Sequence, residues 1–263
     1  MNLTFRLETA ADHHAVEEMT RNAFWKFWGE GLKICDEHFL VSKLRKAEAF
    51  VPELNYIVEL DGNLAGHIIY TKSWIESENG EKHETLTFGP LTVSPEYQRN
   101  GIGQALMKHS FAEAKRLGYR AVLIFGHPNY YPRAGFKRAS EFGITTSDGS
   151  SFDAFMVYIL YEGALDGIQG KYFIDSVYEN LSQEEVFEFD KRFPPKQPHQ
   201  LTPIDILLEQ LDPEAAKSLQ DNGLKYLDEM TSRSYREILS LPGINEKVID
   251  TIKKVLHERN FPW

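Results

Sequence analysis

A short loop with two glycines contains residues whose types and spacing could bind an anion. Residues 98–103 read Gln-Arg-Asn-Gly-Ile-Gly, between an apolar segment that ends at Val93 and an amphipathic segment that follows. At a strand-to-helix turn, successive backbone N–H groups converge and the helix dipole adds partial positive charge. Glycine also lets the backbone approach a phosphate without a Cβ. The same glycines could simply make a tight turn, and this spacing alone leaves both interpretations open.

Two well-known phosphate loops are excluded by the same residues. Position 106 is leucine, so the third glycine of a dinucleotide-binding G-x-G-x-x-G loop is missing. No Gly-Lys-Ser or Gly-Lys-Thr follows, which excludes a Walker loop. A phosphate bound here would therefore belong to neither of these two classes of site.

Predicted helices and strands alternate on both sides of this loop. The apolar patterns predict helices at 12–24, 36–49 and 101–117, and strands near 5–7, 56–60, 64–71, 84–93, 121–125 and 153–161. Asp61-Gly62 between two apolar runs predicts a β-hairpin. Gly89-Pro90 inside a strand pattern predicts a bulge or a splay in the sheet. The alternation indicates an α/β (α+β) domain over residues 1–161.

The composition changes after residue 161. Residues 162–192 are acidic and aromatic without a clear period, and we expect an extension that packs on the first domain. Residues 193–203 hold several prolines, which predicts a stiff linker. Residues 204–263 predict a small all-α domain, because Asp212-Pro213 and Asn245 stand where helices would begin.

Charge and cysteine content restrict the classes of partner. The net charge of −10 argues against nonspecific binding of nucleic acid, which requires a surplus of Lys and Arg. No apolar run approaches the ~18 residues of a membrane span, so no membrane association is expected. With a single cysteine, Cys35, no internal disulfide forms, and a cytoplasmic location is expected. Cys35 and His38 are too few ligands for zinc, so no metal site is expected.

The wider stretch around the loop resembles a known family. Leu91–Leu106, LTVSPEYQRNGIGQAL, closely resembles motif A of the GNAT acetyltransferase superfamily. Tyr130–Phe136, YYPRAGF, is similar to a segment of the bacterial branch of predicted N-acetyltransferases. The resemblance covers residues 4–161 and implies the GNAT fold, with a mixed central sheet flanked by helices. It also implies acetyl-CoA as the acetyl donor and a primary amine, of a small molecule or a peptide, as the acceptor.

The resemblance assigns residues to the donor. It implies that loop amides hold the pyrophosphate of acetyl-CoA, at Arg99, Asn100, Gly101, Ile102, Gly103 and Gln104. It implies that the preceding strand bonds the pantetheine arm through Leu91 and Val93. The family's usual Asn-x-x-Ala after the next strand is replaced by His127-Pro128-Asn129-Tyr130, and we expect Asn129 to contact the cofactor.

Acetyl transfer by direct attack needs an acid and a base, but no covalent acyl-enzyme. The resemblance places Tyr131 beside the departing thiol as the acid, although a purely structural tyrosine is an open alternative. His127 and Glu84 are the candidate bases, and a structural or surface role is the open alternative for each. Trp25, Phe27 and Trp28 would fill the core or line an acceptor pocket.

The C-terminal region resembles a second family. Residues 223–227 and 235–249 are similar to the C-terminal domain of the RNA polymerase alpha subunit, a helix-hairpin-helix-like fold. That hairpin can contact DNA or protein, but here Asn245 replaces its second glycine. Residues 201–263 carry 8 Lys and Arg against 11 Asp and Glu, a net charge that should repel phosphates.

Three readings of the whole chain follow. The first is an acetyl-CoA-dependent N-acetyltransferase with a small domain, residues 204–263, for a protein partner. The alternatives are a non-catalytic acyl-CoA-binding module that acts through this domain, and a DNA-associated regulator. A homodimer is left open, and the sequence does not identify the acceptor amine.

Overall fold

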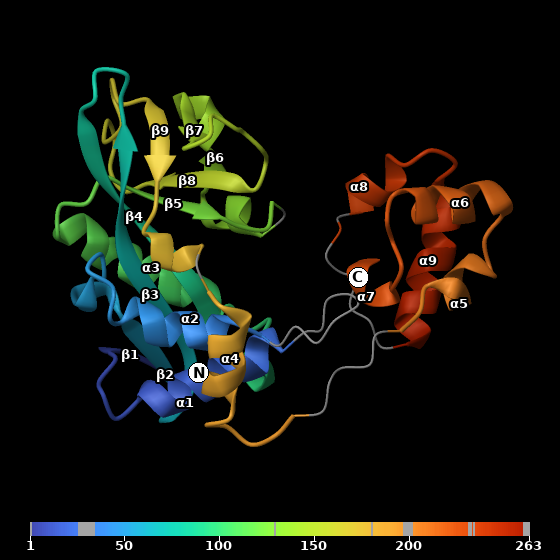
Figure 1. Cartoon of the computed structure of the whole chain (residues 1–263), viewed down its shortest axis with the longest axis horizontal. Coiled ribbons are helices and arrows are strands. Elements are labelled where there is room, and N and C mark those ends of the chain that lie inside the picture. The colour runs from blue at the N-terminus through green and yellow to red at the C-terminus, as the bar shows by residue number, and fades with distance from the viewer. Residues whose placement is uncertain are drawn as a thin grey trace. The chain divides into compact units, whose positions relative to one another are not determined.

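The apolar runs between residues 56 and 93 form adjacent strands in the computed structural model of the chain (Figure 1). This structure describes residues 2–25, 35–128, 130–179, 181–196, 202–230, 233 and 235–259. The chain divides into two compact units, the first reaching Lys196 and the second lying beyond it. Of the helices described, none is long and apolar enough to cross a membrane.

The first unit holds a mixed sheet. Its strands are β1 (Leu3–Leu7), β2 (Tyr56–Leu60), β3 (Asn63–Glu76), β4 (Lys82–Val93), β5 (Ala121–Phe125), β6 (Lys137–Arg138), β7 (Ile144–Thr146), β8 (Phe155–Ile159) and β9 (Gly170–Phe173). They follow the order β1-β2-β3-β4-β5-β8-β6, and β9 pairs with β3 and β7. Among the described strands, the β4–β5 and β7–β9 pairs are parallel and the other pairs are antiparallel. The α/β class and the mixed central sheet flanked by helices are therefore confirmed.

The α-helices described in this unit lie on both sides of the sheet. They are α1 (His13–Phe24), α2 (Glu37–Leu44), α3 (Ile102–Arg116) and α4 (Gln183–Asp190), and α4 packs on α1 and α2. The neighbouring residues Ile57 and Val58 point to opposite faces, as strand geometry requires. Ile57 packs with α1 and α2, whereas Val58 packs in the core that includes α3. α3 thus lies on the opposite face from α1 and α2 (Figure 1).

The structure tests several of the predictions made from the sequence. The hairpin at Asp61-Gly62 is confirmed, and both residues have the positive φ that a two-residue turn demands. The bulge at Gly89-Pro90 is also confirmed, because both residues stand opposite Ile69 alone. The helix expected over 36–49 was predicted too long. It ends at Leu44 because the following residues must turn and extend, so that Phe50 can pair with Thr71.

The segment 162–196 contains β9 and α4, which form through packing on the rest of the unit and were not indicated by a periodic pattern of apolar residues. β9 extends the sheet, with Phe173 opposite Trp74. Farther along, Asp190 of α4 accepts two hydrogen bonds from the buried Arg21 of α1, at 2.6 and 2.9 Å. Removing one partner of a buried ion pair typically costs ~3–5 kcal/mol, so this pair holds α4 against α1.

The second unit has its own apolar core. Its helices are α5 (Asp205–Leu208), α6 (Pro213–Asp221), α7 (Leu227–Met230), α8 (Tyr235–Leu239) and α9 (Glu246–Glu258). Asp212 and Asn245 cap α6 and α9 by accepting hydrogen bonds from the first turn of each helix, as the sequence predicts. Buried side chains from all five helices form one cluster, which makes this a self-contained helical region.

The β3–β9 contact yields a test of the fold. A Cβ at Gly170 would lie 2.1 Å from the carbonyl oxygen of Glu76, and the φ of +144° also disfavours other residues. Gly170→Ala should therefore separate β9 from β3. Gly80 has a φ of +80° with open space around it, so Gly80→Ala measures the conformational cost alone. In urea unfolding, Gly170→Ala should lose ~1–3 kcal/mol more than Gly80→Ala. Equal losses would contradict the β3–β9 contact.

Candidate active site

The loop between β4 and α3 presents open backbone donors. Arg99 and Gly101 have positive φ values of 65° and 77°, and Gly101 occupies the cap position of α3. The first backbone bond of the helix runs from Ala105 N to Gly101 O. The N–H groups of residues 102–104 therefore have no partner inside the helix, and no side chain caps them. This is the geometry that attracts an anion to a helix N-terminus.

Residues 102–104, which carry these N–H groups, line a pocket of about 600 Å³, which we call the loop pocket. The described residues that line it include two arginines and no carboxylate: Leu91, Val93, Gln98, Arg99, Gly101, Ile102, Gly103, Gln104, Tyr130, Tyr131 and Arg133. A Cβ at Gly103 would lie 3.0 Å from the hydroxyl of Tyr130, so glycine leaves room for that aromatic wall. The pocket combines positive charge, helix donors and apolar walls, as a site for an elongated anion requires.

The sheet is open beside this pocket. β4 and β5 pair at one position, Leu86 opposite Val122. Beyond that pair the bulge at Gly89-Pro90 follows on β4, and residues up to Val93 pair with β3 on the other edge alone within the described sheet. The free edge of β4 therefore has backbone groups available to a ligand that lies beside it like an added strand.

Tyr131 lies at the end of this opening. Residues Tyr131–Ala134 form a short 3-10 helix, and the Tyr131 ring rests on Gly126, where a Cβ would come within 2.4 Å of it. The ring also contacts Phe88 and Phe136, with centroids 6.0 and 5.4 Å away. Burial, with a smaller contribution from Tyr130, raises the pKa of Tyr131 well above its usual range. The phenol is therefore protonated at neutral pH and can donate a proton.

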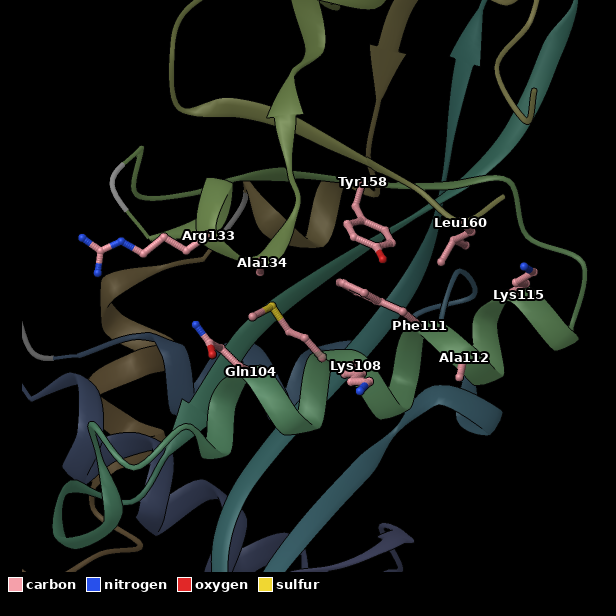
Figure 2. Close-up of a pocket in the computed structure, with 10 residues that line it drawn as sticks. Gln104, Lys108, Phe111, Ala112, Lys115, Arg133, Ala134, Tyr158 and Leu160 are labelled. Carbon is pink, nitrogen blue, oxygen red and sulfur yellow. The ribbon is translucent and has the colours of Figure 1, made fainter. Parts of the chain in front are cut away.

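A second hollow of about 510 Å³, the α3 groove, continues from the loop pocket and shares Gln104 and Arg133 with it. Figure 2 shows Gln104, Lys108 and Lys115 along α3, with Tyr158 of β8 and Leu160, which follows that strand, across the groove from the helix. Among the described residues that line this groove there is no carboxylate either. The positive character of the loop pocket thus extends along the helix.

Residues 17–136 match the model of the Acetyltransferase (GNAT) family. This segment of the chain is a GNAT domain. The chain is 29% identical over 136 residues to the uncharacterized N-acetyltransferase YjhQ of Escherichia coli K12, covering 52% of the chain and 70% of YjhQ. It is 24% identical over 168 residues to the uncharacterized N-acetyltransferase YhbS of the same organism, covering 64% of the chain and 93% of YhbS. The chain therefore contains an N-acetyltransferase domain.

Two solved structures share the fold of the GNAT domain. The crystal structure of YhbS from Escherichia coli in complex with CoA superposes with a TM-score of 0.59 and 21% identity, covering 69% of this chain and 94% of that one. A GNAT family acetyltransferase from Brucella melitensis, in complex with acetyl-CoA, gives a TM-score of 0.52 and 24% identity, covering 67% and 98%.

The GNAT domain gathers most of the residues predicted for donor binding. The loop pocket is lined by Leu91, Val93, Arg99, Gly101, Ile102, Gly103 and Gln104, with Tyr131 beside them. Asn100 is not in this lining. Its side-chain amide donates to Tyr97 O at 3.4 Å and so stabilises the turn. Asn129, like Phe27 and Trp28, lies outside the residues that the structure describes.

The candidate bases are not in the loop pocket. The side chain of His127 is exposed, and its carbonyl accepts hydrogen bonds from the backbone of Tyr130 and Tyr131. Glu84 lies near the start of β4, at the end far from the loop, and pairs with Lys72 at 3.0 Å. Trp25 packs under the guanidinium of Arg21, 4.4 Å from its ring centroid. Structural roles thus account for the positions of Glu84 and Trp25.

Sequence reasoning left out three residues of the loop pocket. Gln98 and Arg133 line it, and so does Tyr130. Tyr130 and Arg133 belong to the YYPRAGF segment, which is distant from the loop in sequence. Their proximity to the loop in the structure could therefore not be read from spacing. The resemblance of that segment was the signal that could have identified them.

Proposed function

We propose that the chain transfers the acetyl group of acetyl-CoA to a primary amine by direct attack within a ternary complex. The observation that carries this proposal is the position of the open first turn of α3 beside the free edge of β4. YhbS and the Brucella melitensis enzyme, which share this fold, bind CoA and acetyl-CoA respectively. Acetyl-CoA supplies the acetyl group as a thioester.

The residues of the loop pocket suit the charged part of acetyl-CoA. The N–H groups of residues 102–104, with Arg99, would hold the pyrophosphate. The edge of β4 at Leu91 and Val93 would bond the pantetheine arm as a strand bonds its neighbour. Lys108 and Lys115 of the α3 groove would then face the phosphorylated nucleoside.

Three tasks fall to the chain's own groups in the reaction. The amine must lose a proton before it attacks, because an alkylamine is mostly protonated at neutral pH. Backbone N–H groups on the β4 edge would stabilise the charge on the carbonyl oxygen, at ~3 kcal/mol per donor. Tyr131, whose phenol is protonated at neutral pH, would protonate the departing thiolate. His127 is retained as the candidate base, through a water molecule, because its side chain is outside the pocket.

For residues 204–263 we propose a protein-interaction domain of the helix-hairpin-helix-like class, on the resemblance to the RNA polymerase alpha subunit. The turn at Gly243 lies against Glu214 of α6, where a Cβ would come within 2.8 Å of that side chain. A carboxylate-bearing side chain beside the hairpin disfavours the backbone of DNA. A protein partner is thus favoured over nucleic acid.

Donor binding is tested by a carboxylate placed at the helix N-terminus. Gly103→Asp should preserve the helix, because an acidic first turn favours its dipole, but its Cβ would displace the Tyr130 hydroxyl and its carboxylate would occupy the anion site. Acetyl-CoA at ~100 times its Kd should stabilise the wild type by ~2.7 kcal/mol in thermal unfolding. Gly103→Asp should lose this shift, and Gly80→Asp, on the β3–β4 turn, should keep it. No shift in the wild type would refute the proposed donor.

The role of Tyr131 is tested by removal of its hydroxyl alone. Tyr131→Phe should lower kcat at least tenfold, ~1.4 kcal/mol, with nearly unchanged affinity for acetyl-CoA. Tyr130→Phe is the matched control, since that hydroxyl lies over Gly103 and not at the end of the opening. Wild-type turnover in Tyr131→Phe would make the residue structural. A wild type that binds acetyl-CoA and acetylates no amine would favour the non-catalytic alternative.

The role of the C-terminal domain is tested with nucleic acid. The full chain should not retard a random DNA duplex in a gel at low salt, because residues 201–263 carry a net negative charge. Retardation that Lys247→Glu abolishes would overturn the protein-interaction proposal and favour a DNA-associated regulator.

A further inference from the structure

We propose that a third hollow, on the other face of the sheet from α3, binds the acceptor and selects a small aliphatic diamine. This inference rests on the proposed acetyl transfer and adds the substrate class to it. The hollow, which we call the aromatic pocket, has a volume of about 570 Å³. It is lined by Phe125, Thr146, Ser147, Asp148, Ser150, Phe152, Tyr172, Phe173, Ile174 and Glu179.

The aromatic pocket and the loop pocket meet at the end of β5. Phe125 is the last residue of β5 and lines the aromatic pocket. The next residue, Gly126, supports the ring of Tyr131, which lines the loop pocket. On the other side of the opening, a Cβ at Gly89 would lie 3.9 Å from the ring of Tyr178, the neighbour of Glu179. The aromatic pocket therefore borders the opening directly at the end of β5, and on the β4 side the ring of Tyr178 lies between its Glu179 wall and Gly89.

The two pockets lie on opposite faces of the sheet. Ile124 points into the core that contains α3, and the loop pocket lies at the start of that helix. Phe125 points the other way, with its ring centroid 5.0 Å from Phe155 and 6.2 Å from Tyr172. A donor bound beside α3 and an acceptor bound in the aromatic pocket would thus meet through the opening, without competing for space.

The walls of the aromatic pocket expose two phenyl rings. Phe125 is 50% exposed and Phe152 is 46% exposed, although their ring centroids are only 5.8 Å apart. They are supported from behind by Phe155 and Tyr172, which are buried. Open aromatic faces on rigid supports attract ammonium groups, by ~0.5–2 kcal/mol per contact.

The pockets on the two faces of the sheet differ in the sign of their charged residues. The described lining of the aromatic pocket contains Asp148 and Glu179 and no basic residue. Hydrogen bonds from Thr146 and Ser150 lower the pKa of Asp148, which is therefore ionised at neutral pH. The loop pocket and the α3 groove, in contrast, are lined by basic residues without carboxylates. One face suits an anionic donor, and the other suits a cationic acceptor.

A diamine meets both requirements of this site. The nitrogen that attacks must be neutral and must reach the opening beside Gly89. A second nitrogen can remain protonated between the carboxylates of Asp148 and Glu179 and the two phenyl rings. A monoamine has one nitrogen, which can either bind to the carboxylates and phenyl rings of the pocket or attack at the opening. A diamine can do both at once, so its second charge should raise kcat/KM.

The test compares amines that differ in the second charge. With acetyl-CoA, 1,4-diaminobutane should have a kcat/KM at least tenfold above that of butylamine. Nα-acetyl-lysine amide, which presents a lysine side chain with one charge, should react like butylamine. Glu179→Gln, Asp148→Asn and Phe152→Ala should each reduce the diamine-to-butylamine ratio at least threefold. They should all keep the shift in melting temperature caused by acetyl-CoA.

Two controls match these variants in type. Glu78→Gln removes an exposed carboxylate on the β3–β4 turn, and Phe187→Ala removes a ring of α4 that is 39% exposed. Both should keep the wild-type ratio. Acetyl transfer without a preference for the diamine, a preference for the lysine amide, or equal losses in Glu78→Gln and Glu179→Gln would each overturn the aromatic-pocket proposal alone. Failure of acetyl-CoA to bind would instead refute the proposed function.

Discussion

The loop pocket and the opening in the sheet both depend on the separation of the neighbouring strands β4 and β5. β4 and β5 pair at Leu86 and Val122 and then separate, which leaves backbone donors and acceptors of β4 without a strand partner on that edge. Such groups are costly to bury unless something satisfies them. The bulge at Gly89-Pro90 turns β4 at this point, and Tyr131 lies at the far side of the opening on Gly126. A ligand that supplies the missing bonds would complete the sheet.

The opening between β4 and β5 also connects the two faces of the sheet. On one face, the open first turn of α3 and its basic neighbours provide positive potential. On the other face, the pocket at Phe125 is acidic and aromatic. Opposite potentials on the two faces would guide an anionic and a cationic reactant to opposite sides of one opening. The division of charge therefore supports a ternary complex over sequential use of a single pocket.

Local patterns were sufficient to predict the elements around the donor site. The turn at Asp61-Gly62, the bulge at Gly89-Pro90 and the helix after Gly101 each follow from a few adjacent residues. β9 could not be predicted in this way, since four residues without alternation become a strand only by pairing with β3 and β7. The aromatic pocket was missed for a related reason, because its lining comes from three separate parts of the chain.

The residues after 161 connect stability to specificity. β9 and the turn that follows contribute Tyr172, Phe173 and Glu179 to the aromatic pocket. α4 then fixes this segment through Asp190, whose carboxylate pairs with the buried Arg21. Arg21 also donates to Pro194 O at 3.1 Å, so the segment is held beyond the helix as well. None of these residues lines the loop pocket. With the acceptor bound as we propose, a change in this segment would alter the choice of amine while the residues of the loop pocket remain in place.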